Sequence, residues 1–147
     1  FFEGVGKLLS QISAEKLENI RIFPDDVRDL LPALPVSCLE KIFVLFPDPW
    51  PKKRHHKRRL FQIGFLELLA GATMPNAEVF FSTDHDGYAR WVLALFLHSP
   101  FFTWESKVGE DWRCRFPNIV STRYENKALR AGRHSMFLKF RRNGVTC

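Results

Sequence analysis

The feature that most constrains the fold is an apolar run at residues 41–46, which ends directly in a segment containing three prolines. Its β-branched and aromatic residues predict a strand, and its lack of polar alternation predicts burial on both faces. Strands of that kind lie inside parallel sheets, whose neighbouring strands are joined by long crossover connections. The chain should therefore alternate strands with helices.

The rest of the chain carries the patterns that such an alternation requires. Further strands are predicted at residues 19–23, 78–83 and 135–140. Apolar residues at helical spacing predict helices at residues 4–14, 27–31, 60–69 and 88–96. We therefore expect one domain over residues 1–147, with an α/β fold around a mostly parallel sheet. Phe137 interrupts the alternation of the last strand, and the aromatic residues Phe101, Phe102 and Trp104 are expected to pack in the core.

Composition narrows the class of partner. The net charge is +6, and its excess is local, because residues 52–59 contain six Lys or Arg and no acid. This imbalance predicts a polyanionic partner, with nucleic acid favoured over an acidic membrane surface. No apolar run approaches the roughly 20 residues of a membrane helix. Cys38, Cys114 and Cys147 lack the spacing of a disulfide framework or a zinc site, which favours a reducing cytoplasmic setting.

Acidic residues follow three of the predicted strands. Asp25 and Asp26 follow the first, Asp48 the second and Asp84 the third. Ligands of open α/β sheets bind beyond the carboxyl ends of the strands, so these carboxylates are candidate site residues. The alternative is that they only cap the helices that come next.

The segment from Phe46 to Pro51 is the sharpest of these features. Each of its prolines restricts the residue before it, which predicts extended geometry at Phe46, Asp48 and Trp50. A stiff loop of this kind would hold the Asp48 carboxylate and the Trp50 ring in place for catalysis. The alternative is a purely structural turn with Trp50 in the core.

The basic run that follows, Lys52 to Arg59, predicts phosphate binding with a strong dependence on salt. A solvated charged face and a localisation signal are the alternatives. The adjacent pair His55-His56 does not have the spacing of metal ligands on a helix, so we predict no metal site.

Together these segments resemble the signature of the tRNA (guanine-N7)-methyltransferase family. The first motif is Phe46 to Trp50 with the basic run after it. Residues 82–89, with Thr83-Asp84 and Tyr88-Ala89, resemble the second motif, and residues 122–128, with Gly132 beyond, resemble the C-terminal Thr-x-Phe/Tyr-Glu-x-Lys motif. The resemblance implies a Rossmann-like class I fold, S-adenosylmethionine as cofactor, and transfer of its methyl group to N7 of a guanosine in the tRNA variable loop.

The resemblance also implies roles for single residues. Asp48 would be catalytic, and Asp26 and Asp48 would contact the cofactor. The substrate would be bound by Lys52, Asp84, Thr122, Arg123, Tyr124 and Glu125. The tRNA backbone would be bound by Arg54, His55, His56, Lys57, Arg58 and Arg59. Because guanine N7 is an unprotonated acceptor, it needs no strong base, and carboxylates such as Asp48, Asp84 and Glu125 would hold the base and offset its new charge.

The sequence departs from the family pattern near its start. The family's Gly-rich turn and the acidic residue after its second strand are absent, and Gly4-Val5-Gly6 is a lone pattern at the head of a predicted helix. We therefore expect the first strands of the family fold to be missing from this sequence. Two alternatives stay open: a methyltransferase acting on an exocyclic amine, since Asp48-Pro49-Trp50 resembles the Asp-Pro-Pro-aromatic loops of such enzymes, and a non-catalytic RNA-binding module.

Overall fold

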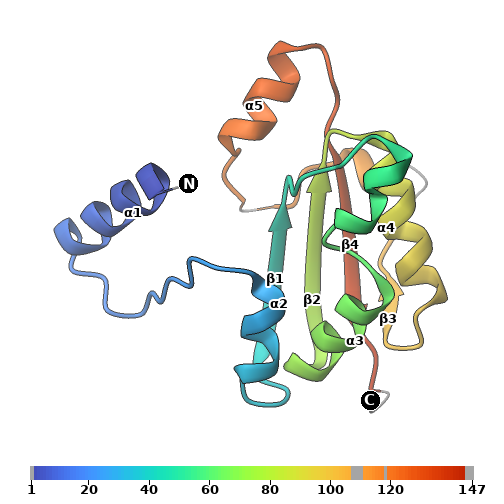
Figure 1. The fold of residues 1–147 in the computed structure, drawn as a ribbon, viewed down its shortest axis with the longest axis horizontal. Coiled ribbons are helices and arrows are strands. Elements are labelled where there is room, and N and C mark those ends of the chain that lie inside the picture. The colour runs from blue at the N-terminus through green and yellow to red at the C-terminus, as the bar shows by residue number, and fades with distance from the viewer. Residues whose placement is uncertain (1, 107–110, 118, 145–147) are drawn as a thin grey trace.

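The computed structural model describes residues 2–106, 111–117 and 119–144, and it contains a four-stranded sheet in the order β1-β2-β4-β3 (Figure 1). The strands are β1 (Leu39–Leu45), β2 (Thr73–Thr83), β3 (Phe102–Trp104) and β4 (Met136–Arg142). Strands β1 and β2 pair in parallel, whereas β4 is antiparallel to both β2 and β3.

The α/β class is confirmed, but the expectation of a mostly parallel sheet is wrong. The reason lies in helix α5 (Arg123–Arg130), which stands at the carboxyl ends of β1 and β2 (Figure 1). Because β4 follows directly from α5, it enters the sheet at that end and runs against β2.

The other helices are α1 (Phe2–Ala14), α2 (Val27–Leu30), α3 (Ile63–Ala72) and α4 (Asp86–His98). Short 3-10 turns complete the structure as η1 (Leu31–Ala33), η2 (Lys53–Arg58) and η3 (Asp111–Arg113). The predicted helices and the strands at residues 78–83 and 135–140 are confirmed with shifted ends. The predicted strand at residues 19–23 is wrong, because no described residue pairs with that segment and it stays irregular.

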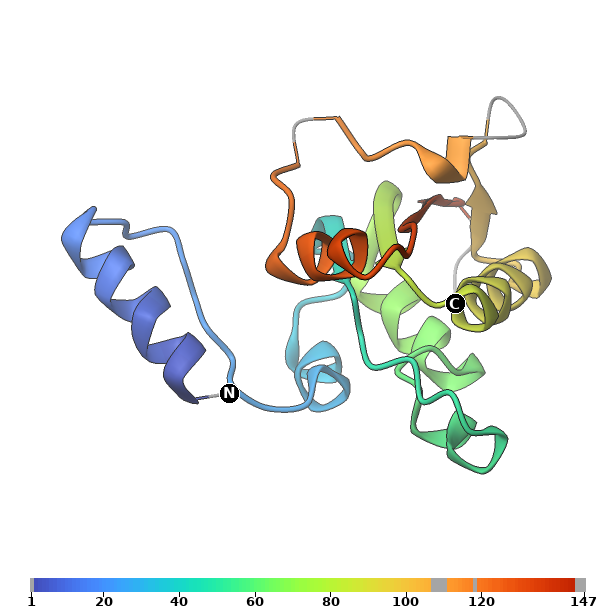
Figure 2. The same ribbon diagram turned by 90° about the horizontal axis from the view of Figure 1, so that it is seen from above.

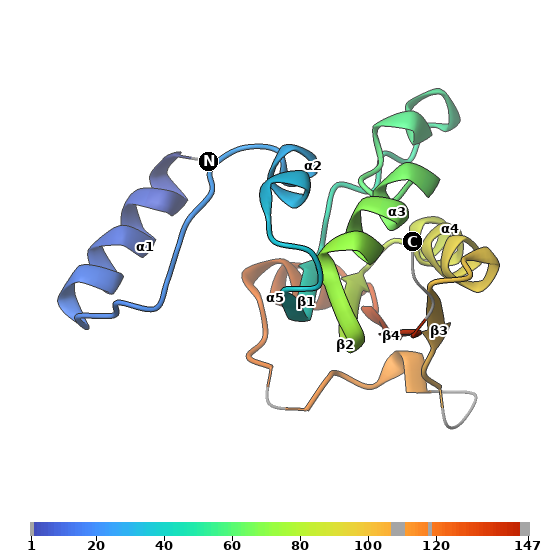
Figure 3. The same cartoon turned by 90° about the horizontal axis from the view of Figure 1, so that it is seen from below.

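Helices α3 and α4 cover one face of the sheet, and most of the core lies beneath them (Figure 3). Its centre is aromatic: the rings of Phe96 and Phe140 stack with centroids 3.7 Å apart, and Phe61 packs edge-on against Phe81. Phe102 is buried in this cluster, with Phe101 and Trp104 packed against it. The prediction that these three aromatic residues belong to the core is confirmed.

A smaller cluster lies on the opposite face, which the segment from η3 to α5 crosses (Figure 3). Phe137 packs there against Phe80 and Phe116, with ring centroids 5.4 Å apart for Phe116 and Phe137. The residue that interrupts the alternation of β4 is therefore buried on the second face, while Met136, Leu138 and Phe140 are buried as well.

Strand β1 forms an edge of the described sheet, which corrects the prediction that it is buried on both faces. Phe43 and Leu45, which point to the face opposite Ile42 and Val44, are 47% and 37% exposed, and no described strand pairs with the outer side of β1. Helix α1 stands apart from the sheet at the end of an irregular connection (Figures 1 and 2). No helix among the described residues is long and apolar enough to span a membrane. Cys38 and Cys114 are exposed free thiols, and Cys147 lies outside the described residues.

Candidate functional site

The parallel pairing of β1 and β2 brings two of the predicted acidic residues to one edge of the sheet. Leu45 lies beside Ser82 in the register, and the amide of Phe46 donates to the carbonyl of Ser82 at 2.9 Å. Asp48 and Asp84 therefore leave the sheet side by side, beyond the carboxyl ends of both strands, as ligand-binding residues of open α/β sheets do.

The loop that carries Asp48 is strained. Phe46 and Trp50 have φ angles of +51° and +43°, so the prediction of extended geometry is wrong for these two residues. Left-handed backbone at residues other than glycine costs about 1–3 kcal/mol each and persists where surrounding contacts enforce it. The neighbouring prolines fix their own φ angles, which further restricts the loop.

A buried arginine holds this loop. Arg59 is only 2% exposed, and its Nε donates to the carbonyl oxygen of Pro49 at 2.9 Å. Its guanidinium lies over the rings of Tyr88 and Trp91, at 5.0 and 5.3 Å from their centroids. Burial lowers the pKa of Arg59 from its usual value. The expected contact between Arg59 and RNA is thus corrected, because the guanidinium is enclosed by protein.

The other residues of the basic run lie at the surface, in turn η2 and at Lys52, the residue before it. The exposed members are Lys52, Lys53, Arg54, Lys57 and Arg58, while His55 and His56 are half-buried. Arg58 lies 4.9 Å from the centre of the Trp50 ring, and His55 meets that ring edge-on. Trp50 is therefore a half-exposed platform beneath the cations, and not a core residue.

Asp84 is oriented by an arginine from a distant part of the chain. Nε of Arg133, in the turn between α5 and β4, donates to Oδ2 of Asp84 at 2.7 Å. The next residue, His85, caps α4 by accepting from the amide of Tyr88 at 3.1 Å. Neither Arg133 nor the cap at His85 was predicted from the sequence.

The C-terminal motif forms the first turn of α5. Thr122 caps the helix by accepting from the amide of Glu125 at 3.1 Å, as expected for a Thr-x-x-Glu capping pattern. Glu125 is 5% exposed and its Oε1 is paired with Nη2 of Arg115 at 2.5 Å. Arg123 and Tyr124 point outward and are exposed.

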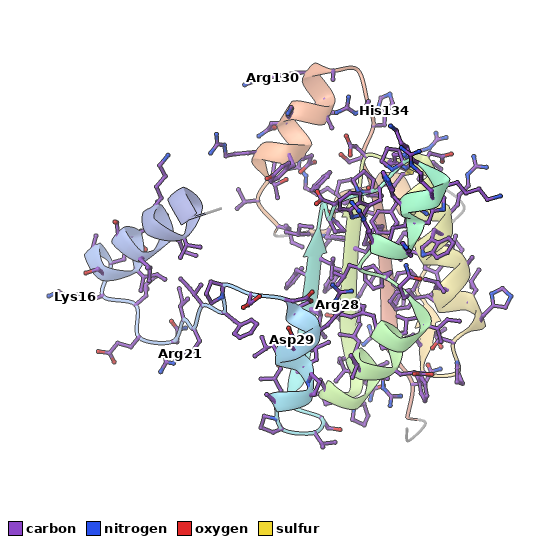
Figure 4. The ribbon with its side chains drawn as sticks, in the orientation of Figure 1. Lys16, Arg21, Arg28, Asp29, Arg130 and His134 are labelled. Carbon is purple, nitrogen blue, oxygen red and sulfur yellow. The ribbon has the colours of Figure 1, made fainter. Side chains whose placement is uncertain are left out.

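Asp26 lies on the N-terminal side of α2, which sits in front of β1 (Figure 4). It accepts from the amide and the guanidinium of Arg28, and these hydrogen bonds lower its pKa to about 2. No hydrogen bond or ion pair among the described residues joins Asp26 to Asp48 or Asp84, and a shared role of Asp26 and Asp48 in cofactor binding stays a prediction.

Of the four acidic residues to which the resemblance assigns a role, three are therefore paired with arginine: Asp26, Asp84 and Glu125. Asp48 is exposed and has no ion pair or hydrogen bond with a described residue. The charge of Asp48 still acts on a buried group. Burial raises the pKa of Tyr88, and the negative charge of Asp48 adds to that rise. The described residues contain no cluster of three His, Cys, Asp or Glu that could hold a metal ion.

The site thus combines a carboxylate without a described partner, beyond the end of a parallel strand, with a cationic surface. A family described as "Putative methyltransferase" matches residues 1–138, and the chain belongs to this family.

Individual relatives carry a more specific name. The chain is similar to a tRNA (guanine-N(7)-)-methyltransferase of Rhodospirillum rubrum, with 49% identity over 97% of the chain and 56% of that protein. Proteins of the same name from Rhodopseudomonas palustris and Hyphomonas neptunium are 42% and 46% identical over 97% and 88% of the chain. The chain spans 54% to 59% of the length of these relatives.

Proposed function

We propose that the chain carries the substrate-binding and transfer half of a tRNA (guanine-N7)-methyltransferase. The methyl group of S-adenosylmethionine would pass to N7 of a guanosine in the tRNA variable loop. The observation that carries this proposal is the free carboxylate of Asp48, on a strained and clamped loop that leads directly into the cations of η2. The names of the relatives support the same reaction.

The two residues that the resemblance assigns to the cofactor differ in how well they suit it. Asp48 fits, because a free carboxylate beyond a parallel strand suits a positively charged group. Asp26 would first have to give up its hydrogen bonds with Arg28. When bound, S-adenosylmethionine supplies a methyl group on a sulfonium ion, which a neutral nucleophile can take without prior loss of a proton.

The chain's own residues would act on the base and on the RNA backbone. The bound cofactor would supply its methyl group to the N7 lone pair, and the purine ring would then carry the positive charge that the sulfonium loses. Asp48 would offset the charge that develops on the ring, an electrostatic contribution that grows during the reaction. The exposed cations of η2 would hold the phosphates and so align the guanosine with the methyl group.

A second candidate, a non-catalytic RNA-binding module, is favoured by one observation. Gly4 and Gly6 lie inside helix α1, so they do not form the Gly-rich turn that class I enzymes place against their cofactor. Cofactor affinity separates the two candidates. Binding of RNA without any binding of S-adenosylmethionine would favour the module.

The test of the proposed reaction is methyl transfer into tRNA that lacks 7-methylguanosine. It is measured for the chain alone and for the chain joined to the upstream segment that the resemblance predicts. Mass spectrometry of the digested tRNA then identifies the modified atom. Label at N7 of a variable-loop guanine supports the proposal. Label on an exocyclic amine supports the alternative of a methyltransferase that acts on such amines. No label in either form contradicts both. A tRNA substrate is also compatible with the cytoplasmic setting expected from the sequence.

A further inference from the structure

One arginine of the basic run differs from its neighbours in where its charge lies. Arg59 is buried, whereas Lys57 and Arg58 directly before it are exposed. Its guanidinium lies over the rings of Tyr88 and Trp91 in helix α4. A phosphate group of RNA therefore has no access to this cation unless the rings move.

Contacts with α4 fix the backbone on both sides of Arg59. Trp91 donates from Nε1 to the carbonyl of Phe61 at 2.9 Å, and its ring meets that of His56 with centroids 5.7 Å apart. The side-chain amide of Gln62 donates to the carbonyl of His56 at 2.9 Å and to that of Arg59 at 3.3 Å. The guanidinium of Arg59 thus has a defined position relative to the helix.

This position is passed on to the loop of Asp48. Nε of Arg59 donates to the carbonyl of Pro49, the residue directly after Asp48. At the start of the loop, the amide of Phe46 donates to the carbonyl of Ser82 in β2. Asp48 lies between these two hydrogen bonds and forms neither a hydrogen bond nor an ion pair with a described residue. The position of its carboxylate therefore depends on how the loop is held on either side.

The hydrogen bond from Arg59 acts at a strained point of that loop. The carbonyl of Pro49 belongs to the peptide group that joins Pro49 to Trp50, and Trp50 has a φ angle of +43°. Left-handed backbone at a residue other than glycine persists where surrounding contacts enforce it. The guanidinium supplies such a contact, because it fixes the orientation of this peptide group.

We propose that Arg59 is a positioning residue for methyl transfer and not a contact for RNA. It holds the peptide group after Pro49 and so places the Asp48 carboxylate relative to the target base, while the exposed cations of η2 bind the RNA. The inference rests on the proposed function for the identity of the reaction. The control of the loop by Arg59 can be measured without that reaction.

The first test separates catalysis from RNA binding, in the chain joined to the predicted upstream segment. Arg59→Gln should lower kcat by about 10- to 100-fold, because a misplaced catalytic group costs up to about 100-fold. The KM for tRNA should stay within about twofold, and the slope of log affinity against log salt should not change. Arg54→Gln, at an exposed position of the same run, should lower that slope by about 0.7 to 0.9.

Two further variants distinguish positioning from charge and from general loss of structure. Arg59→Lys keeps a cation that can bind phosphate but lacks the planar fork that lies on the two rings, so it should also lower kcat. Arg90→Lys makes the same exchange at an exposed position of α4 and should leave kcat within about twofold. Denaturant unfolding gives the folded fraction of each variant, and kcat is calculated per folded molecule.

Nuclear magnetic resonance measures the loop itself. The amide of Trp50 belongs to the peptide group whose carbonyl accepts from Arg59. Its resonance should therefore move in Arg59→Gln and in Arg59→Lys, and it should stay in place in Arg90→Lys.

Three results would each overturn the inference: a salt slope that falls as much in Arg59→Gln as in Arg54→Gln, an unchanged kcat in Arg59→Gln, or an unmoved Trp50 resonance. A different result would show that only the proposed reaction is wrong. If the unchanged protein transfers no methyl group, that reaction fails. A moved Trp50 resonance with an unchanged salt slope then still supports the hold of Arg59 on the loop.

Discussion

Nε of Arg59 lies 2.9 Å from the carbonyl oxygen of Pro49, and this hydrogen bond ties the end of the basic run back to the loop of Asp48. The same guanidinium rests on the rings of Tyr88 and Trp91, so it joins the loop after β1 to helix α4. Trp91 in turn donates to the carbonyl of Phe61 at 2.9 Å. Arg59 thus connects the loop of Asp48 to the aromatic core.

Replacement of Arg59 by Ala should destabilise the protein by about 2–4 kcal/mol, because it removes a charged hydrogen bond and leaves a cavity. Denaturant unfolding measures this change. Arg59→Lys should recover only part of it, since an ammonium group lacks the planar fork that lies on the two rings. Lys53→Ala, an exposed change in the same run, should stay within about 0.5 kcal/mol of the unchanged protein. Equal effects of the two alanine variants would contradict the structural role of Arg59.

Acid should weaken the sheet through a charge network on its second face. Lys139 pairs with Glu78 and Glu105, and Arg141 pairs with both as well. The hydrogen bond from Lys139 lowers the pKa of Glu78, and the hydrogen bond from Arg141 lowers the pKa of Glu105. The network joins β2 and β4 to Glu105, the residue directly after β3.

The direction of the pH effect on stability follows from these lowered pKa values. A glutamate with a lowered folded pKa contributes stability above its unfolded value of about 4.3 and loses it as the pH falls through the folded value. The free energy of unfolding should therefore be level near neutral pH and fall below about pH 4.5. Each partly exposed pair contributes only about 0.2–1 kcal/mol. The variant Glu78→Gln/Glu105→Gln should reduce this fall, and an unchanged profile would show that other groups cause it.

Arg133 is predicted to set the orientation of Asp84. Arg133→Gln should raise the KM for tRNA several-fold, because Asp84 loses the ion pair that fixes its carboxylate. Its effect on stability should be small, within about 1 kcal/mol, since the pair is partly exposed. A matched control is Arg90→Gln, which removes the pair between Arg90 and Asp86 at 2.9 Å on α4. If both variants change the KM alike, the effect belongs to net charge and not to Asp84.

The sequence predicted which residues form helices and strands better than it predicted which strands lie next to each other. Apolar runs at β1 and β2 marked both strands, and helical spacing marked α1, α3 and α4. The direction of β4 could not be predicted from such patterns. It depends on the end of the sheet at which α5 lies, because β4 begins there. The position of β1 at an edge was missed for a similar reason, since a pattern of apolar residues does not say which neighbours are present.

The candidate site was predicted in part. Asp48, Asp84 and Thr122 were found from motifs, and the Thr-x-x-Glu pattern would also have indicated the helix cap at Thr122. Arg59 looks like its neighbours in the basic run, and only the tertiary contacts with Pro49, Tyr88 and Trp91 set it apart. Arg115 and Arg133 carry no sequence signal, because their acidic partners are 10 and 49 residues away.

The proposed reaction depends most on the negative charge of Asp48, and the variant Asp48→Asn tests this dependence. The substitution preserves the size of the side chain and the strained loop but removes the charge that would stabilise the methylated ring. Methyl transfer to tRNA and tRNA affinity are measured side by side, in the chain joined to the predicted upstream segment. We expect kcat to fall by about 100-fold or more while tRNA affinity stays within about twofold. Full methyl transfer by Asp48→Asn would show that the reaction does not need this charge.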